Sequence, residues 1–302
     1  MSEALSRWFG GGSSLAERAW ASAGPALFIF GCVFVLFALF VARCALRGIP
    51  RDAETETRGE TVLVSRFLRH FYIWALAPVC RFVLWAGISA NVLTVVSALV
   101  GVAAGVAAGV GSISLAGWLL LASGVLDGLD GRVARARKSA TQAGAALDSV
   151  LDRYVDLAFL IGLSWYYRAS WVLLPVLLAL LGSSLVPYVR ARGEGLGVSI
   201  KSGLMQRVER LFLFVVGTAL TPVFDAIVSP NTESPIHGLA VGMIIFIAVM
   251  SNFTALTRLR ALLAALSPKP AEGRAPQPVE GRSPSAIEAP SAQQHRSSVS
   301  ST

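Results

Sequence analysis

Residues 127–152 read DGLDGRVARARKSATQAGAALDSVLD, and they lie between two long apolar segments of the chain. Four aspartates recur in this stretch: Asp127, Asp130, Asp148 and Asp152. One aspartate at the centre of a membrane-spanning helix costs about 2.5–3.5 kcal/mol on insertion scales, so four of them need a compensating partner. A pair of divalent cations is the simplest such partner, because it brings four positive charges to four negative ones. The stretch therefore predicts a metal site on two adjacent apolar helices.

The composition agrees with an integral membrane protein. Of the 302 residues, 54% are hydrophobic and 15% are charged, whereas soluble domains contain about 25% charged residues. The mean hydropathy is +0.63. Seven apolar stretches are long enough to cross a bilayer, at about 20 residues each. They cover residues 26–46, 90–110, 113–135, 142–167, 170–190, 210–228 and 238–260.

The segments around these stretches define the expected organisation. Residues 1–61 are an N-terminal extension that carries the first span, which is expected to be retained because no signal-peptide pattern precedes it. Residues 62–87 mix arginines with Phe, Trp and Leu, which is typical of an amphipathic helix at the membrane surface. Residues 88–262 hold the other six spans, and residues 267–302 are rich in Pro, Ser, Ala and Gln, which predicts a disordered tail. The predicted fold is all-α: a six-helix membrane core, one extra N-terminal transmembrane helix and one interfacial helix.

Basic residues fix the expected orientation. Lys and Arg gather after the third span, between the fifth and sixth spans and after the seventh. All three groups face the cytoplasm if the N-terminus lies outside. The acid cluster then also lies on the cytoplasmic side of a multi-pass protein of the cell membrane. The net charge of +8 follows from these loops, and no nucleic-acid-binding module accompanies it.

The spacing of the four aspartates indicates one shared site. Asp127 and Asp130 are three residues apart and Asp148 and Asp152 are four apart, so each pair lies on one helical face. The loop between the helices is short, so the two faces can meet. Carboxylate oxygens suit hard cations such as Mg²⁺ or Mn²⁺, and no nearby His or Cys offers a softer site. Two such ions beside a basic residue are typical of phosphoryl transfer.

Three other interpretations remain open at this point. The aspartates could pair with Arg132, Arg135 and Arg153 and merely hold the helices together, although four acids facing one another favour metal. A divalent-cation transporter should carry acids through the depth of the membrane, whereas these lie at one end of one hairpin. A catalytically silent scaffold is the third alternative, and the complete set of acids argues against it.

The stretch also matches a known signature. It resembles the motif of the CDP-alcohol phosphatidyltransferases at eight positions, with the same gaps: Asp127-x2-Asp130-Gly131-x2-Ala134-Arg135-x8-Gly144-x3-Asp148-x3-Asp152. The resemblance covers about residues 88–262. It implies that the chain transfers the phosphatidyl group of CDP-diacylglycerol to a small alcohol and releases CMP, in phospholipid biosynthesis. It further implies that the four aspartates bind two Mg²⁺ or Mn²⁺ ions, that Asp152 is also the general base, and that the protein forms homodimers.

The same resemblance implies contacts with the liponucleotide. Gly131 and Arg135 would contact its CDP moiety, and so would Thr141 in the loop between the helices. Asn91 would contact the cytidine side from the start of the preceding span. The family often has Pro where this chain has Ala90.

A second pattern bears on the alcohol acceptor. Residues 188–195 (YVRARGEG) and 203–210 (GLMQRVER) resemble the branch of the family that transfers inositol phosphate. The resemblance implies that Arg190 and Arg210 hold the phosphate of the acceptor, and Arg258 could supply a third cation. The alternative is that these arginines only set the topology. Glycerol 3-phosphate is the chief rival acceptor, but the Gly-Lys-x-Lys-Thr run expected of that branch is missing from the sequence.

Overall fold

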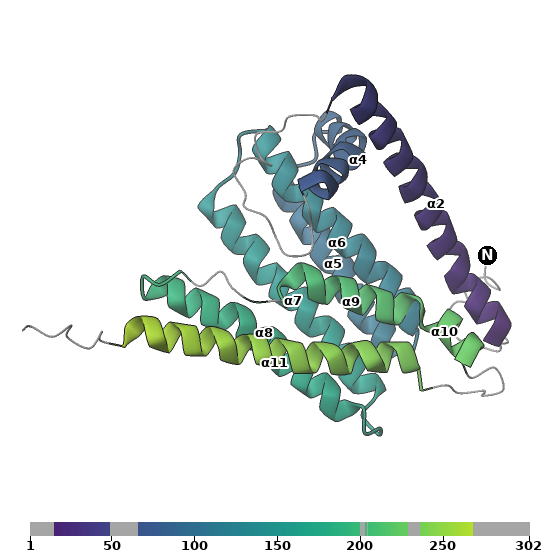
Figure 1. Cartoon of the computed structure of the whole chain (residues 1–302), viewed down its shortest axis with the longest axis vertical. Coiled ribbons are helices and arrows are strands. Elements are labelled where there is room, and N and C mark those ends of the chain that lie inside the picture. Colours follow the sequence, from purple (N-terminus) through teal and green to yellow (C-terminus); the bar gives the residue numbers. More distant parts are fainter. Residues whose placement is uncertain (1–14, 49–65, 200–202, 204, 229–235, 268–302) are drawn as a thin grey trace, which may run out of the picture. The chain divides into compact units, whose positions relative to one another are not determined.

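The computed structural model describes residues 15–48, 66–199, 203, 205–228 and 236–267, and all regular structure within them is α-helical. The all-α prediction is therefore confirmed. The expected tail at 267–302 lies almost wholly outside the described residues. The helices of the described part are α2 (Leu15–Arg47), α4 (Arg66–Trp85), α5 (Ala90–Gly109), α6 (Ile113–Ala136), α7 (Gln142–Tyr166), α8 (Leu173–Gly195), α9 (Arg207–Ala219), α10 (Thr221–Val228) and α11 (Gly238–Leu266) (Figure 1).

Five of these helices are long and apolar enough to cross a membrane, namely α2 from Ser22 onward, α5, α6, α8 and α11. The bent pair α9 and α10 makes a sixth candidate. The prediction of several spans is confirmed. The sequence predicted seven spans, and α7 is the one that is not among the six candidates. That helix has 25 residues, which is long enough, yet its first half carries several charged side chains and lowers its hydropathy.

Two predicted segments differ from the helices in their bounds. The first helix begins at Leu15 instead of residue 26, because the run from Leu15 to Trp20 consists mainly of good helix formers. The predicted span at 210–228 is broken at Leu220, where α9 and α10 meet at an angle of 49°. Pro222 explains the break, since it has no N–H to continue the helix of α9 and restricts the residue before it.

Helices α6 and α7 both pack along α5 and make few contacts with each other. Small residues allow the approach of α5 to α7. A side chain at Gly105 would collide with the carbonyl of Ala158, and one at Gly162 would collide with the carbonyl of Gly105. The four-residue spacing of Gly101, Gly105 and Gly109 is typical of such close helix packing.

Helix α4 is fastened to α6 by arginines of α6 and of its C-cap. Arg132 Nη1 donates to the carbonyl of Ile73 at 2.9 Å, and Arg137 Nη2 donates to the carbonyl of Leu84 at 3.2 Å. Buried apolar side chains of both helices, such as Cys80 and Leu129, pack between these bonds. Within the segment predicted at 62–87, the structure has a helix from Arg66 to Trp85.

Helix α2 is held at two places. At its N-terminal half, Ser22 Oγ donates to the carbonyl of Ala219, and Ser114 Oγ donates to Ser22 Oγ at 3.1 Å. At its C-terminal half, two phenylalanines meet three aromatic rings of α4: Phe37 and Phe40 against Phe67, Phe71 and Trp74. The extra helix is therefore anchored to the core at one end and to α4 at the other.

The close contact between α5 and α7 can be tested with a pair of glycine variants. Gly162→Ala places a methyl group against the Gly105 carbonyl, and overpacking of this kind costs about 1–3 kcal/mol. We expect a lower apparent Tm in detergent for Gly162→Ala. Gly242→Ala is the matched control, because nothing lies within 4 Å of the added methyl and alanine is favoured over glycine inside a helix. Equal Tm values for the two variants would contradict this packing.

Candidate metal and substrate site

The structure brings together three of the four predicted metal ligands. One carboxylate oxygen from each of Asp127, Asp148 and Asp152 lies within 4.8 Å of the other two. Asp127 comes from α6 and the other two come from α7, so the group joins two helices that make few other contacts with each other. The donors are all hard oxygens, which fits Mg²⁺ or Mn²⁺.

The N-terminus of α7 sets the position of its two aspartates. Thr141 is the N-cap, and its Oγ1 accepts a hydrogen bond from the backbone N–H of Gly144 at 3.0 Å. Capping satisfies one of the N–H groups that the first turn of a helix leaves without a partner. The helix therefore starts at a defined residue, and Asp148 and Asp152 follow in its second and third turns.

Asp130 lies apart from the other three aspartates in this structure. Its carboxylate is buried against α5, where Thr94 Oγ1 donates to Oδ2 at 2.5 Å. Asp130, the fourth predicted ligand, thus lies one helical turn from Asp127 and is hydrogen-bonded to Thr94. The sequence shows Thr94 near the start of its span, but nothing in the pattern indicated this bond.

An arginine that the sequence analysis treated only as a loop charge lies at the centre of the cluster. Arg207, the first residue of α9, contacts Asp127 Oδ2 through Nη1 at 2.6 Å and Asp152 Oδ1 through Nη2 at 2.8 Å. Its Nε lies 3.9 Å from Oδ1 of Asp156. Arg207 therefore bridges α6, α7 and α9, and its side chain is only 20% exposed.

Asp156 was also missed as a member of this cluster. It lies four residues after Asp152, so the spacing of Asp148, Asp152 and Asp156 puts all three on one face of α7. That periodicity was the available signal. Asp156 Oδ2 accepts from Arg210 Nη2 at 2.9 Å, which links the acid cluster to the predicted acceptor arginines.

A divalent ion and the Arg207 guanidinium would compete for the same oxygens. The guanidinium contributes one positive charge and contacts two of the three carboxyl groups, those of Asp127 and Asp152. Asp127, Asp148 and Asp152 are therefore the residues that would hold a cation here. The ion-pair alternative for the aspartates is realised by Arg207 and not through Arg132, whose Nη1 bonds to a backbone carbonyl of α4.

The residues predicted to contact CDP fall into two groups beside the acids. The Arg135 guanidinium folds over Gly131, where an added Cβ would lie 3.2 Å from its Nη1. Asn91 Oδ1 and Thr141 Oγ1 lie on either side of Gly144, at 3.6 and 3.2 Å from the position of a Cβ there. Bare backbone at Gly131 and Gly144 leaves room that a side chain would fill.

The three predicted acceptor arginines come from three different helices and gather in one region. Arg210 on α9 and Arg258 on α11 are 3% and 4% exposed, and both Arg190 on α8 and Arg210 lie within electrostatic range of Arg258. Arg258 Nη1 donates to the carbonyl of Val186 at 3.0 Å. Arg190 is more exposed and pairs with Glu194 at 2.9 Å.

Helix α4 brings one more polar group to the rim of the cluster. The hydroxyl of Tyr72 rests on the backbone of Gly128, the residue after Asp127, and any side chain at Gly128 would collide with it. Burial raises the pKa of the Tyr72 phenol, so the hydroxyl keeps its proton and can donate a hydrogen bond.

Comparison with known proteins agrees with this geometry. Residues 87–251 match the profile of the CDP-alcohol phosphatidyltransferase family. The chain is 42% identical over 141 residues to a bifunctional IPC transferase and DIPP synthase of Aquifex aeolicus, covering 44% of this chain and 33% of that protein. It is 40% identical over 131 residues to archaetidylinositol phosphate synthase of Methanothermobacter thermautotrophicus, covering 43% of this chain and 66% of the relative. The chain thus spans between one third and two thirds of the length of these relatives.

A solved structure shows a similar fold. The crystal structure of phosphatidylinositol phosphate synthase from Mycobacterium tuberculosis, in complex with manganese and citrate, superposes with a TM-score of 0.54 at 26% sequence identity. The match covers 64% of this chain and 92% of that one. The same enzyme has also been solved with CDP-DAG bound.

The competition between Arg207 and a metal ion gives a test of the cluster. Arg207→Gln leaves partly buried carboxylates without their cation, and because the side chains are 15–20% exposed the loss of stability should stay below the roughly 3–5 kcal/mol of a fully buried pair. We expect a lower apparent Tm without metal and a larger rise in Tm on adding Mn²⁺ than in the unchanged protein, because a ligand of the folded state stabilises it by mass action.

Arg260→Gln, an exposed change near the end of α11, is the control and should leave both quantities unaltered. A Tm of Arg207→Gln that equals that of the control, with and without Mn²⁺, would rule out the bridging role of Arg207.

Proposed function

The chain belongs to the CDP-alcohol phosphatidyltransferase family, and on that premise we propose that it transfers the phosphatidyl group of CDP-diacylglycerol to inositol phosphate in the membrane. The observation that carries the proposal is the convergence of Asp127, Asp148 and Asp152 from two helices on one point. The relative whose structure contains manganese, and was also solved with CDP-DAG, supports the choice of metal and donor.

The proposed reaction is a displacement at phosphorus. The acceptor hydroxyl gives its proton to the carboxylate of Asp152 and attacks the β-phosphorus of the liponucleotide. A new bond forms between phosphorus and the acceptor oxygen, the bond to the bridging oxygen breaks, and CMP leaves. Two Mg²⁺ or Mn²⁺ ions, held by Asp127, Asp130, Asp148 and Asp152, would neutralise the diphosphate charge.

The other site residues bind and orient the substrates in this proposal. Gly131, Arg135, Thr141 and Asn91 contact the CDP moiety, and their position around Gly131 and Gly144 supports this. A donor with two acyl chains stays in the bilayer, since each methylene exposed to water costs about 0.8 kcal/mol. The enzyme therefore takes its donor from the lipid phase and its polar acceptor from the water.

We also infer the arrangement in the membrane. Helices α5 to α11, which cover the predicted core at 88–262 and end at Leu266, form a six-span core in which α7 crosses with its charged half at the active site. Residues 1–61 add the α2 span, and α4 within 62–87 lies at the interface. The loop charges support an active site on the cytoplasmic side of the cell membrane, and the family suggests a homodimer.

Inositol phosphate is the proposed acceptor because three arginines gather beside the acid cluster. Arg190, Arg210 and Arg258 would bind its phosphate, and an arginine fork matches phosphate geometry. Relatives named for inositol-phosphate chemistry support this choice. Glycerol 3-phosphate has the same phosphate and is the second candidate.

A panel of acceptors tests the proposal as a whole. The purified protein in detergent receives labelled CDP-diacylglycerol, Mg²⁺ and one of inositol phosphate, glycerol 3-phosphate, inositol or serine, and CMP release is followed. We expect turnover with inositol phosphate, loss of it with EDTA and recovery with excess Mg²⁺. Preference for another acceptor would overturn the acceptor assignment, and turnover in EDTA would overturn the metal site.

The general-base role of Asp152 has its own test. Asp152→Asn keeps the shape of the side chain but cannot take the proton, and loss of a general base costs about 100- to 10,000-fold in kcat. The comparison variant is Asp156→Asn, one turn further along the same face of α7, and it should keep a larger share of kcat. Normal turnover by Asp152→Asn, or an equal loss in both variants, would disprove the assignment.

The acceptor pocket predicts a difference between the two substrates. Arg190→Gln removes a charged hydrogen bond to the acceptor, and a bond of this type is worth about 1.5–3 kcal/mol, or roughly tenfold or more in KM. We expect KM for inositol phosphate to rise while KM for CDP-diacylglycerol stays unchanged. Arg192→Gln, an exposed change two residues along α8, should alter neither. Equal effects of Arg190→Gln on both KM values would argue for a purely topological role.

A further inference from the structure

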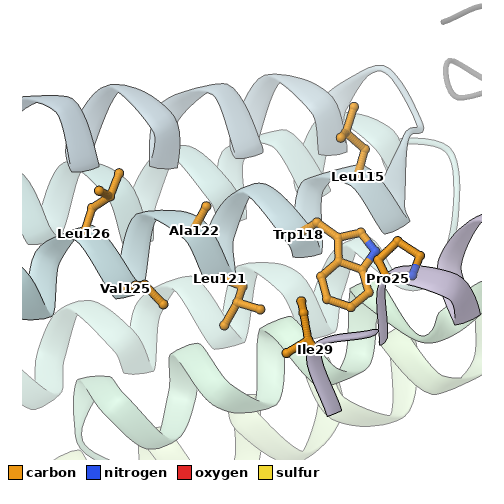
Figure 2. A pocket seen from close by; sticks show the side chains of 8 residues that line it. All are labelled: Pro25, Ile29, Leu115, Trp118, Leu121, Ala122, Val125 and Leu126. Atoms are coloured by element: carbon orange, nitrogen blue, oxygen red, sulfur yellow. The ribbon is translucent and has the colours of Figure 1, made fainter. Parts of the chain in front are cut away.

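An apolar groove lies between α2 and α6. Its volume is about 640 Å³, and two residues of α2 and six of α6 line it: Pro25, Ile29, Leu115, Trp118, Leu121, Ala122, Val125 and Leu126 (Figure 2). The groove belongs to the part of α2 that includes Pro25 and Ile29, between the serine anchor at Ser22 and the aromatic anchor at Phe37 and Phe40. Every lining side chain is apolar except for the indole N–H of Trp118, which is buried and has no hydrogen-bond partner among the described residues.

The groove has the dimensions of one leaflet. Its lining on α6 extends from Leu115 to Leu126, which is about 16 Å at 1.5 Å per residue. The hydrocarbon core of a bilayer is about 30 Å thick, so this length is close to half of it. The groove ends at Leu126, the residue before Asp127 in the sequence, while at about 100° per residue the groove side chains are centred on the face of α6 opposite Asp127. A lipid whose phosphates lie at the acids would reach the groove with one chain that passes around α6, and the depth of the groove matches such a chain.

Tyr72 stands between the groove and the acids. Successive residues of an α-helix are rotated by about 100° around its axis. Viewed down the axis of α6, Gly128 therefore lies between Asp127 and the near edge of the groove. That edge is formed by Leu121 and Val125. The Tyr72 hydroxyl rests on Gly128. Tyrosine has an apolar ring and a polar tip, which suits a boundary between hydrocarbon and a polar group.

We propose that the lipid donor seats one acyl chain in the α2–α6 groove and its glycerol ester oxygens at the Tyr72 hydroxyl, while its diphosphate lies at the acid cluster. The site is built on α2 and α4, both of which precede the residues matched by the family profile. It rests on the proposed function, because the donor is taken to be CDP-diacylglycerol. The N-terminal extension is then a part of the substrate site that selects acyl chains.

Trp118 allows occupancy to be measured without turnover. The protein is reconstituted in bilayers that contain either brominated CDP-diacylglycerol or brominated phosphatidylcholine. The fluorescence quenching of Trp118 is obtained by subtracting the quenching of Trp118→Phe from that of the unchanged protein. We expect quenching at a lower mole fraction of brominated CDP-diacylglycerol than of brominated phosphatidylcholine. Equal quenching by the two lipids would show ordinary surrounding lipid and overturn the proposal, and so would the absence of quenching.

Variants connect occupancy with activity. Ala122→Phe fills the groove about five residues from Asp127, so the phenyl ring takes the space of the acyl chain and kcat/KM for dioleoyl CDP-diacylglycerol should fall about tenfold, which corresponds to about 1.4 kcal/mol. The value for the dihexanoyl donor, whose chains are too short to reach the filled part, should change little. Ala103→Phe, on an exposed face of α5, is the control. If Ala122→Phe lowered kcat/KM equally for the dioleoyl and the dihexanoyl donor, the groove assignment would be contradicted.

Tyr72→Phe removes only the hydroxyl. Loss of one hydrogen bond, worth about 0.5–1.5 kcal/mol, should raise KM for the donor about two- to tenfold and leave kcat and KM for the acceptor unchanged. A fall in kcat alone would contradict a binding role. If no acceptor gives CMP release from CDP-diacylglycerol while Trp118 is quenched selectively, the proposed function fails and the lipid site stands, so the two failures are distinguishable.

Discussion

A partly buried cluster of carboxylates needs positive charge, and this constraint determines the rest of the structure. Three carboxylates from two helices approach within 4.8 Å of one another, and like charges at this distance repel strongly where water is scarce. Arg207 relieves part of the repulsion with ion pairs of 2.6 and 2.8 Å. One guanidinium cannot balance three carboxylates, so the cluster retains affinity for a cation.

The packing of the helices serves this cluster. Because α6 and α7 meet mainly through α5, the distance between Asp127 and the aspartates of α7 depends on how closely α5 approaches each of them. Gly105 and Gly162 set that distance on one side, since any side chain there would push α7 away. On the other side of α6, α2 and α4 enclose lipid-facing surface. The family core thus supplies the charge site, and in our proposal the N-terminal segments line the site of the donor's acyl chain.

Local patterns in the sequence predicted the helices well but not their tertiary partners. The predicted spans at 90–110 and 113–135 agree with α5 and α6 within a residue or two, because apolar length and short loops are local properties. The spacing of the aspartates predicted a shared face for each pair. What the sequence could not show is which distant cation enters the cluster: Arg207 lies more than fifty residues beyond Asp152, among several basic loop residues with the same local pattern. The bond from Thr94 to Asp130 is non-local in the same way.

The central claim is that the aspartates form a cation site, and a crystal soaked in manganese tests it most directly. An anomalous difference map should show two manganese peaks about 4 Å apart among Asp127, Asp130, Asp148 and Asp152, with the Arg207 side chain withdrawn from the oxygens that it contacts in this structure. A map without manganese at these carboxylates, with Arg207 still bridging Asp127 and Asp152, would contradict the account.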